Sequence, residues 1–305
     1  METAHAKATA AEAAKDGKRR EVQGMLRVTF FGTTTLLFDD GNDQILFDAH
    51  FTRPSLGKYV RGAEARTDTR TCDRLMRVHR MDRLRAIFIS HTHHDHVMDA
   101  PYVANKSGAV IYGSSSAKNV ALGGGVREDR VVVFQDGSEY SIGEYRIRVI
   151  GSIHSKPTIL NNDLGVTIEE PLAQPAGLRE YTEGGSFDFY IEHGGKKILI
   201  RPSFNFIEGQ LDGIRADVLF LGVAGLGKAD GETERTFFAE TVEKTGAGLV
   251  IPVHWDDFFV PLNEPTAGMP PMIERTEMVF FKLAKYCEAH GVDLAIQYPC
   301  TGLRL

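Results

Sequence analysis

Residues 91–96 read His91-Thr92-His93-His94-Asp95-His96, and they directly follow an apolar run at 85–90 that is typical of a buried strand. Alternate side chains of a strand share one face, so we expect His91 and His93 to point the same way as the chain leaves the sheet. Asp95 and His96 then fall in the turn into a helix, while His94 turns away. The spacing predicts two nitrogen ligands for one metal ion and a carboxylate plus an imidazole for a second. A loop of surface histidines is the alternative, but imidazoles crowded this closely repel one another once protonated.

Length and composition predict one large globular domain over residues 25–305. The chain has 305 residues, of which 42% are hydrophobic and 25% charged, and this is enough to bury a substantial core. Residues 1–24 are rich in Ala, Lys, Glu and Arg and predict a flexible charged tail. The tail has no apolar segment typical of a signal peptide or membrane span. We therefore expect a cytoplasmic protein, with a removed export signal as the open alternative.

Net charge and cysteine content limit the classes of binding partner and the state of the cysteines that we expect. The net charge of -6 and the lack of a basic stripe beyond the tail disfavour a nucleic-acid-binding protein. Cys72, Cys287 and Cys300 are widely spaced and odd in number, which favours free thiols over a disulfide framework. We expect a small-molecule substrate and no membrane or nucleic-acid partner, and leave a homo-oligomer open.

Strand and helix patterns interleave along the chain. Residues 26–48 predict an opening meander of three strands, and later apolar runs predict enough strands for a second sheet. Helical patterns lie between them, the longest at 274–290. This interleaving predicts an α/β fold, a four-layer αββα sandwich with the metal at one edge of the sheets.

These features resemble the metallo-β-lactamase-fold hydrolases, nearest to the lactonase-like branch that includes L-ascorbate-6-phosphate lactonase. The family has an Asp closing an early strand, the His-rich run, a lone His after a later strand and a final His. Asp48, His154 and His254 match the first, third and fourth of these marks. The resemblance implies that Asp48 braces the metal loop. It also implies the two ligand sets, which are His91, His93 and His154 for one ion, and Asp95, His96 and His254 for the other.

One mark of the family is missing. Relatives with two metals carry a bridging Asp after a Gly-Lys-rich hairpin and strand, and here Ser203 stands at that place. A neutral hydroxyl is a poor ligand for a hard divalent cation, so the second site loses an anionic donor. The excess positive charge favours either an anionic substrate or weak occupancy of the second site. Arg201 adds to this field, or is a solvated cation at the strand end.

Three irregular segments are candidates for the substrate pocket. Residues 154–183 break the regular pattern directly after a proposed ligand, where loops carry specificity. Residues 256–271 follow Trp255 and include an aromatic and apolar run, which predicts either a pocket wall or a loop packed on the core. His50 and Arg53 leave the first sheet on the metal side, where we expect them to contact an anionic substrate.

The predicted metal site implies hydrolysis. Water on one or two divalent ions becomes hydroxide near neutral pH and attacks a carbonyl or phosphoryl centre. We expect Asp95 to take a proton from the attacking water, and Asp256 to orient His254 or protonate the leaving group. The ligand types indicate Zn, with Mn or Fe as alternatives. The predicted function is a hydrolase of a small anionic ester, lactone or phosphoester.

Two other classes of function stay open. A metal-stabilised binding or scaffold protein of the same fold has the Ser203 departure as its support. Iron redox chemistry is the second, but the resembling flavodiiron proteins favour Glu where His93 stands and usually carry a flavin domain.

Overall fold

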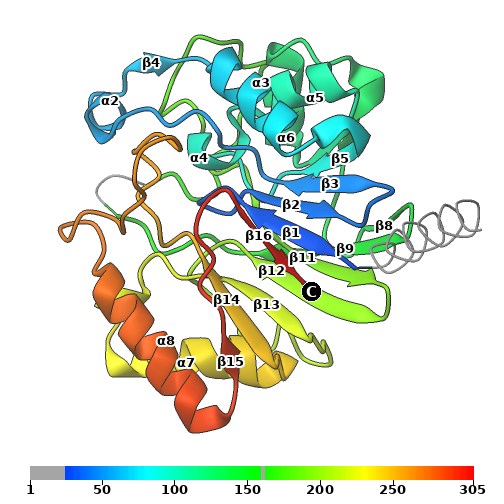
Figure 1. Cartoon of the computed structure of the whole chain (residues 1–305). Helices are drawn as coiled ribbons and strands as arrows, with labels where there is room; N and C mark the ends of the chain where they lie inside the picture. The colour runs from blue at the N-terminus through cyan, green and yellow to red at the C-terminus, as the bar shows by residue number, and fades with distance from the viewer. Residues whose placement is uncertain (1–24, 159–161) are drawn as a thin grey trace, which may run out of the picture.

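Two seven-stranded sheets stack between layers of helices in the computed structural model of the chain, which describes residues 25–158 and 162–305 (Figure 1). The predicted tail, 1–24, lies outside the described residues. The four-layer sandwich expected from the sequence is confirmed.

The first sheet has the strand order β16-β1-β2-β3-β5-β6-β7. Its strands are β1 (Arg27–Phe30), β2 (Leu36–Asp39), β3 (Gln44–Phe47), β5 (Leu84–Phe88), β6 (Val110–Gly113), β7 (Val131–Val133) and β16 (Thr301–Arg304). The opening meander is antiparallel, and β3, β5, β6 and β7 then pair in parallel.

The second sheet has the strand order β15-β14-β13-β12-β11-β9-β8. Its strands are β8 (Glu139–Ile142), β9 (Tyr145–Ser152), β11 (Ser186–His193), β12 (Lys196–Arg201), β13 (Val218–Gly222), β14 (Leu249–Val253) and β15 (Asp293–Leu294). β12 to β15 pair in parallel, and β11 runs antiparallel to both β9 and β12. The carboxyl ends of β9, β12, β13 and β14 therefore reach the same edge.

Helices cover the outer faces of both sheets (Figure 1). Above the first sheet lie α3 (Thr69–Val78), α5 (Ala100–Ser107) and α6 (Ser115–Gly123), and below the second lie α7 (Gly231–Phe238) and α8 (Thr276–His290). A π-helical turn, Ala239–Glu243, continues α7. The short elements are α2 (Leu56–Val60), α4 (His94–Val97), 3₁₀ turns at Met81–Arg83, Glu128–Arg130 and Leu226–Lys228, and the pair β4 (Glu64–Ala65) and β10 (Ala176–Gly177).

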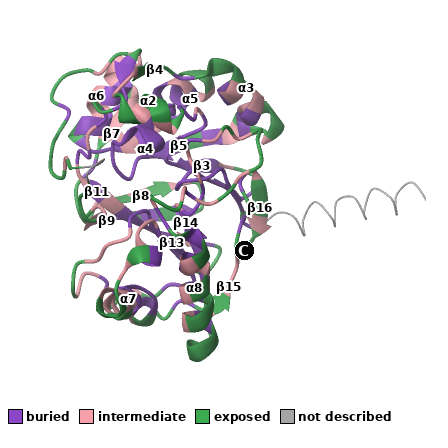
Figure 2. Ribbon diagram, turned by 90° about the vertical axis from the view of Figure 1, so that its left-hand side faces the viewer, coloured by how far each residue is buried: buried purple, intermediate pink, exposed green. Residues whose placement is uncertain are grey.

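The apolar strands of the first sheet are buried on both faces. Ile45 and Phe47 of β3 belong to the core between the sheets, whereas Leu46 packs into the core under α3, α5 and α6. Neighbouring β5 repeats the pattern, with Phe88 facing the inner core and Ile87 the outer one. Such strands read as continuous apolar runs because both faces are covered. Figure 2 shows buried residues concentrated in the central strands.

The edges of the sheets differ from the sequence prediction. The apolar run near the C-terminus predicts a strand over residues 293–297, but β15 covers only Asp293–Leu294. β8 and β16 were not predicted, because these edge strands expose most of their side chains and lack an apolar run. Cys72, Cys287 and Cys300 are free thiols, as expected. In the described part of the chain, no helix is both long and apolar enough to cross a bilayer.

Candidate metal centre

The predicted ligands gather where several strands end. His91 follows β5, His154 follows β9 and His254 follows β14. Asp48 directly follows β3, the parallel neighbour of β5. In α/β sheets ligands bind at the carboxyl ends of strands, and here the two sheets bring such ends to one edge.

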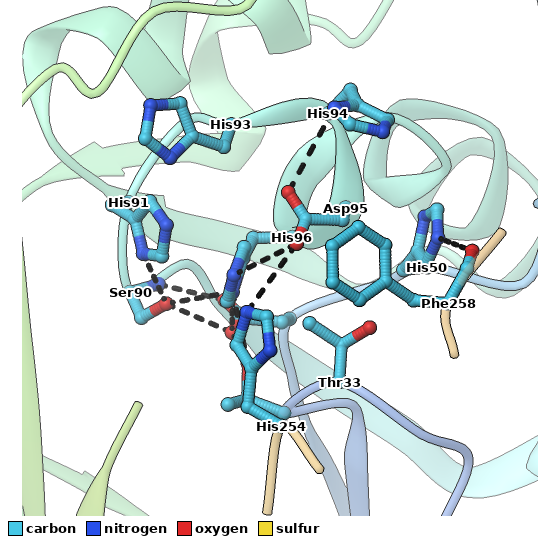
Figure 3. A network of polar contacts seen from close by, with 12 residues as sticks. Thr33, His50, Ser90, His91, His93, His94, Asp95, His96, His254 and Phe258 are labelled. Atoms are coloured by element: carbon cyan, nitrogen blue, oxygen red, sulfur yellow. Dashed lines mark hydrogen bonds and ion pairs between the residues drawn. The ribbon is translucent and has the colours of Figure 1, made fainter. Parts of the chain in front are cut away.

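The six side chains form two groups with the spacing of metal ligands. The donor atoms of His91, His93 and His154 all lie within 4.8 Å of one another, and those of Asp95, His96 and His254 form a second such group. Figure 3 shows most of these side chains converging on one region. The two groups are adjacent, because the ring centroids of His91 and His96 are 3.7 Å apart. The structure thus brings together the two expected ligand sets.

Asp95 lies at the centre of the second group. Its Oδ2 is 3.5 Å from His96 Nε2 and 3.4 Å from His254 Nε2. Asp95 and His96 belong to α4, whose single turn starts directly after His93. The compact turn explains how residues 93–96 serve both groups.

Asp48 fixes the orientation of His96. Nδ1 of His96 donates to Asp48 Oδ2 at 2.7 Å, so its Nε2 is left as the metal-facing atom. Asp48 also accepts from the backbone N and the Oγ of Ser90, each at 2.8 Å. A carboxylate that holds the outer nitrogen of a ligand His is a recurring feature of metal sites. The contacts match the bracing role that the resemblance implied.

The outer nitrogens of the first group are also occupied. His91 Nδ1 donates to Ser90 Oγ at 3.1 Å, and His154 Nδ1 donates to the carbonyl of Ser155 at 3.1 Å. His93 instead donates from Nε2 to Asp163 at 3.1 Å, which leaves its Nδ1 for an ion. Asp163 was not predicted, because it lies in the irregular loop after His154 and no pattern in the sequence connects it to His93.

Two buried nitrogens indicate that the clusters fit a cation. Nε2 of His91 and Nε2 of His96 are buried without a hydrogen-bond partner among the described residues. Burying such polar atoms unpaired costs free energy, and a bound divalent ion would satisfy both. The donor set of imidazoles and one carboxylate suits Zn, Mn or Fe.

The electrostatics favour the metal-binding protonation states of His91, His154 and Asp95, whereas at His254 burial is outweighed by the contact with Asp95, which raises the pKa. Burial, reinforced by His96, holds the pKa of His91 well below its ordinary value. Burial, with His93 next, lowers the pKa of His154 to about 3. Burial would raise the pKa of the Asp95 carboxyl, but His96 and His254 outweigh it and hold that pKa well below its ordinary value. The two imidazoles are therefore neutral at pH 7 and Asp95 is ionised, as cation binding requires.

Asp48 and His254 have strained backbones. Their backbone φ angles are 52° and 61°, in the left-handed region that residues other than Gly rarely adopt. The backbone N of His254 donates to the carbonyl of Thr33 at 2.6 Å, and Thr33 itself has a φ of 51°. Such strain persists where surrounding contacts hold it and is common at functional sites.

Asp256 and Arg53 pair with each other in the core, so Asp256 is not placed to protonate a leaving group and Arg53 is not placed to contact a substrate, whereas Asp256 can still position His254 through Thr33. Arg53 Nη2 lies 2.8 Å from Asp256 Oδ2, and their side chains are 1% and 0% exposed. Asp256 also accepts from the backbone N of Thr33 at 2.8 Å. A Cβ at Gly32 would lie 1.8 Å from Arg53 Nη2, so only Gly fits against this pair. The ion pair holds the loops beneath His254 together. A cavity lies beside the two ligand groups, and Arg53 and Asp256 are not among its lining residues.

Arg201, His50 and Trp255 also lie away from that cavity. Arg201 is 1% exposed and pairs through Nε with Asp188 Oδ2 at 3.3 Å, so it is neither a solvated cation nor a substrate contact. His50 donates from Nε2 to the carbonyl of Phe258 at 3.3 Å, and burial, with Arg53 next, holds its pKa well below the ordinary value. Trp255 packs against Phe280 at 5.3 Å between ring centroids. These residues support the site from within the core.

A cavity of about 930 Å³ opens onto the metal centre. His93, Asp95, His154 and His254 line it, and so does Ser203, which the sequence comparison with the resembling family aligned with a bridging Asp. The volume lies at the upper end for pockets that hold drug-sized ligands.

An aromatic wall borders the metal end of this cavity. The ring of His94 stacks on Tyr59 with centroids 5.0 Å apart, and Phe258 and Phe259 complete the wall. His94 lies outside both ligand groups, in line with its expected orientation. Of the two alternatives for residues 256–271, the pocket wall is the one observed for Phe258 and Phe259.

Part of the chain matches a known family model. Residues 80–200 match the family model described as Metallo-beta-lactamase superfamily. A protein of Heliobacterium modesticaldum named UPF0173 metal-dependent hydrolase is 25% identical over 256 residues, covering 83% of this chain and 92% of the relative. A protein of the same name from Roseiflexus sp. is 32% identical over 116 residues, covering 38% of this chain and 44% of the relative.

A solved structure supports the fold. Igni18, described as a metallo hydrolase from the archaeon Ignicoccus hospitalis, matches with a TM-score of 0.56 and 14% sequence identity. The match covers 92% of this chain and 98% of that one. At this identity the likeness shows the fold alone.

Proposed function

We propose that this chain, a metal-dependent hydrolase of the metallo-beta-lactamase superfamily, acts on small anionic esters, lactones or phosphoesters, in the manner of the lactonase-like branch. The observation that carries the proposal is the pair of ligand groups at the wall of one large cavity. Two three-residue donor groups beside a cavity support catalysis over a scaffold role.

The first group, His91, His93 and His154, would hold one divalent ion, and Asp95, His96 and His254 would hold a second. When bound, such ions lower the pKa of water and polarise a carbonyl or phosphoryl group. The residues around them orient the ligands and close one side of the cavity to solvent.

We assign proton transfer to Oδ1 of Asp95. Its Oδ2 faces His96 and His254, whereas Oδ1 lies 3.8 Å from His94 Nδ1 and takes no part in the second group's short contacts. Asp95 is ionised and lines the cavity, so it is able to accept a proton from the attacking water. We do not assign proton transfer to Asp256, because its carboxylate pairs with Arg53 in the core.

Lys156 and Arg179 are the cations that we propose for substrate recognition. Both line the cavity and both are exposed. Arg179 lies over the ring of Tyr59, in the aromatic wall, and Lys156 follows His154 by two residues. We propose them for the substrate-binding role that the sequence suggested for Arg53, His50 and Arg201, because the side chains of those three residues are buried.

Lys156→Ala should therefore weaken the preference for anionic substrates. We expect its kcat/KM for mono-p-nitrophenyl succinate to fall about fivefold relative to that for p-nitrophenyl pentanoate, because a partly exposed charge contributes up to ~1 kcal/mol. Lys196→Ala, an exposed lysine at the far end of β12, is the matched control. An unchanged ratio in Lys156→Ala would remove this residue from recognition, and a wild-type preference for the pentanoate would overturn the anionic substrate class.

Ser203→Asp should strengthen the second metal site. The variant restores a carboxylate at the family's bridging position, and we expect the weaker ion to bind about ten- to a hundredfold tighter, the range seen for changes around metal ligands. Calorimetric titration of the metal-free protein measures both sites. Thr233→Asp adds the same charge elsewhere in the cavity as a control. Two equally tight ions in the wild type, with no gain in Ser203→Asp, would show that position 203 does not bridge.

A further inference from the structure

The cavity extends well beyond the metal centre. Its lining includes apolar side chains from three separate segments, which we call the apolar compartment: Phe204 and Phe206 after β12, Phe237 of α7, and Met269 and Ile273 before α8. The reacting group of a substrate needs only the space next to the ligands. A further apolar compartment therefore requires an explanation of its own.

The loop after β12 is built to present aromatic side chains. It carries Ser203 at the bridging position and then Phe204, whose ring packs against Phe237 with centroids 4.4 Å apart. Gly225, at a φ of 122°, leaves room for this ring, because a Cβ there would lie 2.7 Å from Phe204 Cδ1. The segment that carries a metal ligand in the resembling family here forms part of the cavity wall.

The apolar compartment abuts the metal centre directly. The backbone N of Phe204 donates to Ser155 Oγ at 3.1 Å, and Asn205 Nδ2 donates to the carbonyl of His154 at 2.6 Å. The loop bearing the two phenylalanines is thus tied to the loop of a proposed ligand. A molecule reacting at the metal centre has the apolar compartment as its neighbour.

The rim of the compartment is polar. Thr233 and Thr236 of α7 line it, together with Asp230, which caps that helix by accepting from the backbone N of Thr233. A polar rim around an apolar interior suits an arm that enters from water and is buried along its length. A flat surface for a protein partner would lack this enclosure.

We infer that the substrate carries an extended apolar arm, an alkyl chain or an aryl group, which lies in the compartment of Phe204, Phe206, Phe237, Met269 and Ile273 while the polar group reacts at the metal centre. The inference rests on the proposed function and makes its substrate amphiphilic. Burial of each methylene contributes about 0.8 kcal/mol, so affinity should rise steadily with the length of the arm.

Binding of straight-chain carboxylates tests the arm separately from catalysis. Butanoate, hexanoate and octanoate are titrated calorimetrically into the metal-loaded protein. We expect Kd to fall about three- to fourfold for each added methylene. In Phe204→Ala and Phe206→Ala the dependence on length should weaken. In Thr233→Trp, which places a large ring at the rim and obstructs the compartment, octanoate should bind no better than butanoate.

Phe281→Ala is the matched control, because this phenylalanine is 53% exposed and outside the cavity lining. It should keep the wild-type dependence on length. A Kd independent of chain length, or the same dependence in Thr233→Trp as in Phe281→Ala, would overturn the inference. The p-nitrophenyl esters of the same acids are assayed in parallel. Length-dependent binding without turnover of any ester would support the apolar arm and contradict the proposed hydrolase function.

Discussion

His91→Ala will lose bound metal and catalytic activity together. His91 Nε2 is buried without a hydrogen-bond partner among residues 25–158 and 162–305, and it belongs to the three-imidazole group, which gives a nearly complete tetrahedral shell. Loss of an outer partner of a ligand typically costs ten- to a hundredfold in metal affinity or activity, so removal of the ligand itself should cost more than about a hundredfold. Elemental analysis and kcat/KM on the same preparation measure both effects.

The control for this variant is His290→Ala. His290 lies at the end of α8, and its imidazole is exposed and outside both ligand groups. This variant should keep wild-type metal content and turnover. Full metal content with normal turnover in His91→Ala would remove His91 from the ligand set.

Asp256→Ala will destabilise the protein by about 3–5 kcal/mol, the range for breaking a buried ion pair. The substitution leaves the Arg53 guanidinium buried without its carboxylate, and it frees the backbone N of Thr33 beneath His254. Urea unfolding of wild type and variant gives the free energy of unfolding. The double variant Arg53→Met with Asp256→Leu removes both charges and should recover much of the loss.

The same variant separates the two roles considered for Asp256. A positioning role predicts that activity follows the fraction folded, and that the double variant regains turnover along with stability. Unchanged stability in Asp256→Ala, with turnover lost and the alkaline limb of the pH profile shifted, would instead restore the leaving-group role.

The ligand groups were accessible from the sequence because short-range spacing encodes them. Strand and turn geometry alone relate His91, His93, Asp95 and His96, and the resemblance adds His154 and His254 at the ends of other strands. The central strands of the first sheet were equally clear, since burial on both faces produces continuous apolar runs.

The charged residues nearby were harder to place. Arg53 pairs with Asp256, 203 positions away in the sequence, and Arg201 pairs with Asp188 on the neighbouring strand β11. A charge close to a ligand in the sequence is therefore as able to point into the core as into the cavity. Asp163 escaped prediction for the converse reason, because its contact with His93 depends on how a long irregular loop folds back.

Metal content and hydrolysis measured on one preparation test the central proposal most directly. The wild-type protein is stripped with a chelator, reloaded with Zn, Mn or Fe, and assayed at each step by elemental analysis and with p-nitrophenyl esters, γ-butyrolactone and bis-p-nitrophenyl phosphate. We predict that hydrolysis of at least one substrate disappears with the metal and returns with it. Turnover that persists in metal-free protein, or fully loaded protein that hydrolyses none of these substrates, would contradict a metal-dependent hydrolase at this site.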